Sequence, residues 1–165
     1  MDIHHRFHTD QSFRWVRAEA ALGLASLVYL LVAFFDFVNW SRFLFAFVAI
    51  DLVGYLPGAI AYRMARGRLS PADPVAPPIR IAPIYHHLYN LTHSFITVAI
   101  VLGLWWAALG EVEWAMLALP LHLLGDRSLF GNTYKPASLA FEPEPPSAPH
   151  VSPPAALRPS LAPGR

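Results

Sequence analysis

Apolar and polar positions divide the chain into four long apolar stretches joined by polar or proline-rich connections. The stretches cover residues 15–35, 40–62, 84–109 and 113–129. Because an α-helix needs roughly 20 mostly apolar residues to cross a bilayer, this pattern predicts an all-α protein that folds as a four-helix transmembrane bundle. The fourth stretch is the weakest, since Pro120 interrupts it and only residues 114–124 are free of charge. A kinked spanning helix and a re-entrant segment both fit it.

The membrane domain is predicted to cover residues 14–135, after a polar N-terminal segment at residues 1–13. Residues 136–165 are rich in proline and poor in large apolar side chains, so they are predicted to form a disordered tail. The connection at residues 67–83 carries five prolines and is predicted to be extended. Either proline-rich region offers a polyproline segment to a protein partner, and simple solvation is the alternative.

The distribution of basic residues predicts the orientation of the bundle. With four spans, the N-terminal segment, the 63–83 loop and the tail share one side of the membrane. That side holds all of the 12 Lys and Arg residues except Arg42. Basic residues are concentrated on the cytoplasmic side of membrane proteins, so the N-terminus and the C-terminus are both predicted to be cytoplasmic. We therefore expect a multi-pass protein of the bacterial cytoplasmic (inner) membrane, surrounded by the lipid bilayer.

Composition narrows the possible chemistry. The chain is 55% hydrophobic and only 14% charged, which suits a membrane domain. It has no cysteine, which excludes disulfides, thiolate metal sites and cysteine nucleophiles. A net charge of +1, without a basic patch that aromatic residues interrupt, gives no reason to expect nucleic acid as a partner. Phosphate-binding glycine loops and the HExxH and GxSxG motifs are also missing from the sequence.

Five polar residues lie inside the apolar stretches, where burial in lipid is costly. They are Asp51 in the second stretch, Asn90 and His93 in the third, and His122 and Asp126 in the fourth. At 1.5 Å of rise per residue, His93 lies roughly 13 Å from the cytoplasmic end of its helix. Asp51 falls near the middle of the bilayer, and the other residues fall on the cytoplasmic side of it. Because such residues usually face a protein interior or a watery cavity, we expect one shared site.

This site has the composition of a metal centre. His93, His122, Asp126 and Asp51 supply two imidazoles and two carboxylates, which suit a divalent ion such as zinc, iron or manganese. Asp51 is also a candidate catalytic base. Arg127 is a second catalytic candidate, because a cation next to Asp126 would stabilise an anionic group on a lipid-like or isoprenoid-like substrate. The hypothesis is a metal-dependent membrane enzyme.

Three further residues are predicted to support the site. His86 and Asn90 step by four and then three residues to His93, so these side chains share one face of a helix. Glu19 lies near the cytoplasmic end of the first apolar stretch, at the same side of the membrane.

Two other interpretations remain open. The polar residues can instead satisfy one another by hydrogen bonds and fix the register of the helices, in a non-enzymatic accessory or scaffold protein. They can also handle protons or ions. The residues alone do not separate these alternatives from a bound metal.

Three sequence motifs resemble those of a family of small, uncharacterised bacterial integral membrane proteins of the actinobacterial type. The motifs are DLVGYLPG from Asp51, YNLTHS from Tyr89 and HLLGDRSLFGNTYKP from His122, in that order. The similarity covers about residues 13–143. It implies that Asp51, Asn90, His93, His122, Asp126 and Arg127 are the residues of interest, and it implies no activity. The proline-rich connection at residues 67–83 is longer than in the related proteins.

Overall fold

The protein is all-helical throughout the part of the chain that the structure describes. The computed structural model describes residues 10–67 and 79–142. Its six α-helices are α1 (Asp10–Ala33), α2 (Trp40–Gly54), α3 (Leu56–Gly67), α4 (Pro83–Thr92), α5 (Phe95–Leu109) and α6 (Ala118–Gly125). Two short 3₁₀ helices, η1 (Phe35–Phe37) and η2 (Trp114–Leu117), and one π-helix, η3 (Asp126–Phe130), complete the fold.

The predicted number of spans is supported only in part. Among the helices of the described residues, α1 alone is long and apolar enough to cross a membrane. The pairs α2–α3 and α4–α5 each meet the same criterion only when the two helices of the pair are counted as one bent span. The structure therefore supports one span, or up to three, and the predicted four-helix transmembrane bundle is not confirmed. The fourth stretch is divided between η2, α6 and η3.

The two long middle stretches are each broken where the sequence analysis expected one helix. Stretch 40–62 bends by 40° between α2 and α3. Pro57, in the first turn of α3, accounts for this bend, because its ring clashes with a preceding carbonyl and it has no N–H to donate. Tyr55 separates the two helices.

Stretch 84–109 bends by 56° between α4 and α5, and side-chain hydrogen bonds account for the break. The Thr92 hydroxyl donates to the last carbonyl groups of α4, those of Leu88 and Tyr89, each at 3.1 Å. The Ser94 hydroxyl accepts from the backbone N–H of Ile96 and so starts α5 as its N-cap. Hydroxyl groups that compete with the backbone in this way end one helix and begin the next. His93 sits at the break itself.

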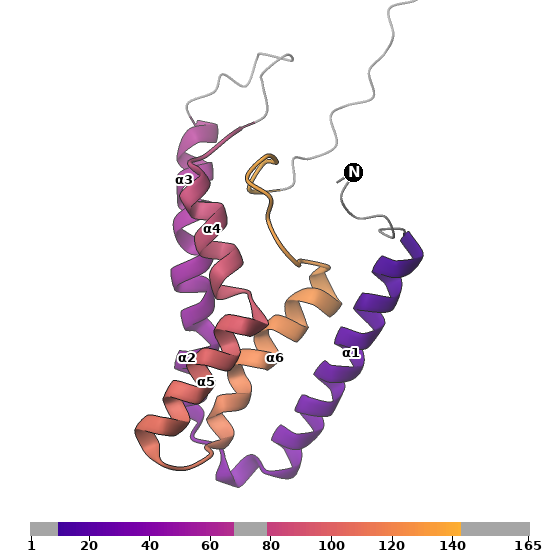
Figure 1. Cartoon of the computed structure of the whole chain (residues 1–165), viewed down its shortest axis with the longest axis vertical. Coiled ribbons are helices and arrows are strands. Elements are labelled where there is room, and N and C mark those ends of the chain that lie inside the picture. The colour runs from indigo at the N-terminus through magenta and orange to yellow at the C-terminus, as the bar shows by residue number, and fades with distance from the viewer. Residues whose placement is uncertain (1–9, 68–78, 143–165) are drawn as a thin grey trace, which may run out of the picture.

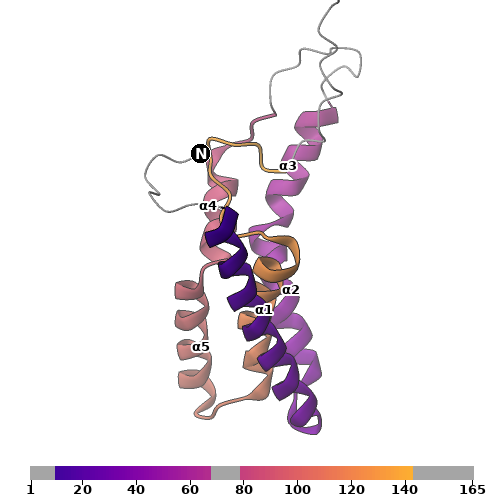
Figure 2. The same ribbon diagram turned by 90° about the vertical axis from the view of Figure 1, so that its right-hand side faces the viewer.

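The helices lie around a central α6 (Figures 1 and 2). Helix α2 packs on α4 and α6, and α1 packs on α6 and η3. The Arg17 guanidinium of α1 donates to the backbone carbonyls of Ser128 and Leu129 in η3, which fastens the two elements together. The start of α1, the end of α3 and the start of α4 lie at one end of the molecule, and the turns after α1 and α5 lie at the other end (Figure 1).

Helices α2 and α4 approach each other closely near the middle of the bundle. A Cβ atom at Gly54 would overlap the Thr92 side chain, so only glycine permits this separation of the helices. Below it, Ala46 and Ile50 of α2 pack against Leu119 and Leu123 of α6 in a buried apolar cluster.

The chain after η3 continues toward the end of the molecule where α3 ends and α4 starts, and it packs against these helices (Figure 1). We call residues 131–142 the C-terminal strap. Phe141 of the strap is only 1% exposed and packs with Tyr62 and Tyr89. The Asn90 side chain holds the strap at Lys135, accepting from its N–H at 2.7 Å and donating to its carbonyl at 3.0 Å. The packed chain therefore extends to residue 142, past the predicted boundary at residue 135.

Three sequence-based predictions fall on parts of the chain that lie outside the described residues. These are most of the N-terminal segment (1–13), most of the proline-rich connection (67–83) and the tail beyond residue 142.

Candidate metal centre

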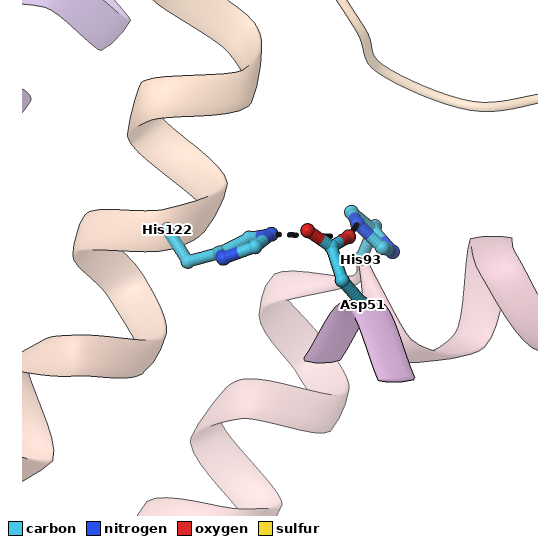
Figure 3. Close-up of side chains that lie close together, drawn as sticks. All are labelled: Asp51, His93 and His122. Atoms are coloured by element: carbon cyan, nitrogen blue, oxygen red, sulfur yellow. Dashed lines mark ion pairs between the residues drawn. The ribbon is translucent and has the colours of Figure 1, made fainter. Parts of the chain in front are cut away.

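Three breaks or bends in the helices meet at one place, and each contributes a potential metal ligand. Asp51 lies one turn before the end of α2, His93 lies between α4 and α5, and His122 lies near the end of α6. One ligand atom from each of these residues falls within 4.8 Å of the others. Figure 3 shows the Asp51 carboxylate between the two imidazole rings. These residues, which are far apart in sequence, thus lie together, as their similar expected depths in the membrane predicted.

Asp126 joins these three residues from the start of the π-helix. Its Oδ2 atom lies 3.3 Å from Nε2 of His93 and 4.0 Å from Nε2 of His122. Oδ1 of Asp51 lies 3.4 Å from Nε2 of His93 and 3.6 Å from Nε2 of His122. Each histidine therefore faces two carboxylates through its Nε2 atom. π-Helical turns are frequent at functional sites because they redirect side chains within a helix.

The backbone fixes which nitrogen of His93 faces the carboxylates. Its Nδ1 atom lies 3.0 Å from the carbonyl oxygen of Tyr89. The Thr92 hydroxyl also lies 3.0 Å from this Nδ1 atom. A carbonyl oxygen can only accept, so the contact with Tyr89 favours the tautomer that carries its hydrogen on Nδ1. Nε2 is then free to offer a lone pair to a metal ion, which is the usual state of a metal-binding histidine with a backbone carbonyl behind it.

Aromatic contacts hold both imidazole rings in place. The Tyr89 ring stacks on His93 with centroids 3.9 Å apart and an interplanar angle of 16°. The Phe47 ring meets His122 edge to face at 4.8 Å. Because His93 is only 2% exposed and His122 is also buried, neither ring can turn away to reach solvent. The site is therefore rigid on its histidine side.

The separations inside the site are too long for hydrogen bonds and suit a bridging cation. N–H···O hydrogen bonds in proteins span about 2.7–3.2 Å, whereas the four histidine–carboxylate distances lie between 3.3 and 4.0 Å. Nε2 of both histidines is buried without a hydrogen-bond partner. A tetrahedral metal with ligands at about 2.0–2.2 Å separates neighbouring ligand atoms by about 3.3–3.6 Å. Three of the four histidine–carboxylate distances fall within that range.

A polar pocket of about 430 Å³ opens from the carboxylate side of this site. Asp51 and Asp126 line its inner end, and the Asp51 side chain is 48% exposed. The remaining walls are formed by Tyr55, Tyr89, Phe130, Asn132, Lys135 and Glu142. The histidines are thus buried, while the carboxylates are accessible from the pocket.

The residues predicted to support the site lie elsewhere. Asn90 holds the C-terminal strap rather than a ligand. His86 is buried against Phe141, edge to face at 5.3 Å. Glu19 is exposed on α1. The guanidinium of Arg127 lies over the Phe95 ring, 4.2 Å from its centroid, and does not line the pocket.

The basic group at the pocket is Lys135, which the sequence analysis did not select. Its Nζ donates to the Phe141 carbonyl at 2.6 Å and lies 3.7 Å from the Glu142 carboxylate. Burial lowers the pKa of this ammonium group, and the Glu142 carboxylate opposes the shift. One signal was present in the sequence: Lys135 is the only lysine of the chain, and it closes the HLLGDRSLFGNTYKP motif.

Comparison of the chain with known protein families, with curated proteins and with solved structures finds no match. The function must therefore be argued from the site itself.

Proposed function

We propose that the protein is a multi-pass protein of the bacterial cytoplasmic membrane that binds one divalent metal ion, with zinc as the best fit. In this proposal Asp51, His93 and His122 are the ligands and the fourth position is open to the pocket. Zinc suits them because two neutral imidazoles and one carboxylate are a ligand set of catalytic zinc sites, which leave a position for water. The observation that carries the proposal is the set of unpaired Nε2 atoms at metal-bridging distances from carboxylates.

Asp126 then takes the role of base. Its Oδ2 atom is close to His93, and its side chain lines the pocket where a metal-bound water would sit. A metal held by Asp51, His93 and His122 would supply the Lewis acid that activates such a water for hydrolytic chemistry. Asp126 would accept the proton that this water gives up. Accordingly, we propose a metal-dependent membrane hydrolase.

The metal is tested by elemental analysis of the full chain, purified in detergent through a tag that contains no histidine. His4, His5 and His8 are replaced by alanine in every protein compared, so that they do not chelate metal. We expect about one zinc ion per chain in this background. His93→Ala, His122→Ala and Asp51→Asn should each reduce the zinc content to a small fraction of that value.

Two matched controls complete the experiment. His86→Ala removes a buried histidine outside the site, and Glu113→Gln removes a carboxylate that pairs with Arg42 at the other end of the bundle. Both should retain zinc. Substoichiometric metal in the parent protein after reconstitution with zinc, or equal zinc in the His93→Ala protein, would contradict the proposal. The polar residues would then form a structural or proton-sharing network.

The four-span topology is part of the same proposal. It pairs α2 with α3 and α4 with α5 as bent spans and adds η2, α6 and η3 as a short, buried fourth span. Broken helices are tolerated at membrane depth where they line a polar site. The bends at Tyr55 and His93 and the π-turn at Asp126 all lie beside the proposed metal ligands. Reporter fusions at residue 38, at residue 72 and after residue 142 test this topology. Periplasmic activity is expected only at residue 38, and periplasmic activity at residue 72 would overturn the arrangement.

A further inference from the structure

The outer part of the polar pocket brings together groups that donate hydrogen bonds. Lys135 contributes its ammonium group, and Tyr89 contributes a hydroxyl that is buried without a hydrogen-bond partner. Tyr89 also stacks on the metal ligand His93, so its ring links the two ends of the pocket. An unpaired buried hydroxyl lowers stability, and a ligand that accepts its hydrogen would recover that loss.

The charges around the pocket explain why the metal is needed for an anion to bind there. Three carboxylates line the pocket, those of Asp51, Asp126 and Glu142, against the one ammonium of Lys135. Without a metal this surface repels anions. A divalent cation beside Asp51 cancels the excess of two negative charges and places a strong anion-binding centre at the inner end.

We propose that this pocket binds a phosphate group, with one oxygen on the metal and others on the Lys135 ammonium and the Tyr89 hydroxyl. The inference rests on the proposed metal site and names its substrate class, a phosphate ester. The metal and two hydrogen-bond donors suit the tetrahedral oxygens of phosphate better than the two coplanar oxygens of a carboxylate. Lysine is a common phosphate-binding residue.

Glu142 regulates this binding by competing for Lys135. Its carboxylate pairs with the ammonium when no ligand is bound. A phosphate that approaches Lys135 must share the ammonium with this carboxylate. Removing the charge of Glu142 should therefore strengthen phosphate binding, the opposite of the effect of removing the charge of Lys135.

The test measures binding to the full chain in detergent, loaded with zinc and freed of excess metal. One arm uses inorganic phosphate, and the other uses phosphatidic acid in mixed micelles, because a soluble ester and a lipid headgroup share the same chemistry. We expect saturable binding that disappears when the metal is removed. Binding in the first arm alone indicates a soluble phosphate ester, and binding in both, with mutual competition, indicates a lipid headgroup.

Four variants test the direction of the expected changes in affinity. Lys135→Met should weaken phosphate binding by about 10-fold or more, since a hydrogen bond to a charged group is worth about 1.5–3 kcal/mol. Lys135→Arg should keep most of the affinity, and Tyr89→Phe should weaken it less than Lys135→Met does. Glu142→Gln should tighten it. Zinc content equal to that of the parent protein shows that each variant has folded.

A second readout uses the fact that Lys135 is the only lysine. An amine-specific reagent can modify only this side chain and the N-terminal amine, which serves as the internal control. Zinc and phosphate together should slow modification of Lys135 several-fold without affecting the N-terminus. The inference is overturned if the zinc-loaded protein binds neither phosphate nor phosphatidic acid, or if the Lys135→Met protein binds them as tightly as the parent protein. Either result leaves the proposed metal site unaffected. Protein without zinc overturns the proposed function itself.

Discussion

The Nδ1 atom of His93 donates its hydrogen to the backbone carbonyl of Tyr89 at 3.0 Å, and this contact decides what the other nitrogen can do. The same carbonyl also accepts from the backbone N–H of His93 at 2.9 Å and from the Thr92 hydroxyl at 3.1 Å. The end of α4 therefore positions the His93 ring, with its Nε2 atom toward the carboxylates.

We predict that zinc stabilises the protein through this site. A ligand present at a hundred times its dissociation constant raises the free energy of unfolding by about 2.7 kcal/mol, so the melting temperature in detergent should rise on adding zinc and fall on adding a chelator. Asp51→Asn should abolish both shifts. Glu113→Gln, which lies outside the site, should keep them. Equal shifts in the Asp51→Asn protein would place the metal elsewhere.

Gly54→Ala should destabilise the protein by about 1–3 kcal/mol, the usual cost of overpacking a close contact. The added methyl group would overlap Thr92 across the α2–α4 contact. Thr92→Ala should restore part of the loss in the double variant, which a thermodynamic cycle can measure. Gly103→Ala on α5 is the control, because a Cβ atom there meets nothing within 4 Å. That substitution should be neutral or stabilising by up to about 1 kcal/mol.

Phe141 should anchor the C-terminal strap. Removing such a buried ring costs about 3–5 kcal/mol, so Phe141→Ala should lower the melting temperature strongly. A chain shortened to end at Glu142 should keep the stability of the full chain, and one that ends at Lys135 should lose it. Leu139→Ala is the matched control, because Leu139 is exposed on the same strap. Equal stability of the two shortened chains would mean that the strap contributes nothing to the fold.

The pKa of Lys135 should lie below the ordinary value of 10.5, because burial disfavours its charged form. The rate at which an amine reagent modifies Lys135 should then rise with pH to a midpoint below 10.5, as followed by peptide mass spectrometry. Glu142→Gln should lower that midpoint further, since the carboxylate raises the pKa. A midpoint at or above 10.5 would contradict the buried position.

The lowered pKa of Lys135 also makes the free energy of unfolding depend on pH. Between the folded-state pKa and 10.5, the unfolded chain binds more protons than the folded chain. The contribution of Lys135 to the free energy of unfolding therefore increases as the pH rises through this window. In Lys135→Met this contribution should be absent, and thermal unfolding measured across the window should show a smaller increase.

The sequence by itself determined where the apolar stretches lie and which ionisable residues interrupt them. Both are local properties: the length of a stretch sets its reach across a bilayer, and a rise of 1.5 Å per residue sets depth along it. That was enough to bring Asp51, His93 and His122 to one level of the bundle. The bends at Tyr55 and His93 have local causes, Pro57 in one case and the Thr92 and Ser94 hydroxyls in the other. The tertiary structure decided the rest. The π-turn at Asp126 and the strap contact of Phe141 depend on packing between segments distant in the chain. For that reason depth alone could not place Arg127 over Phe95 or bring Lys135 to the pocket. The depth of a residue in the bundle follows from its position in the chain. The residues that it contacts depend on how the neighbouring helices are rotated and packed.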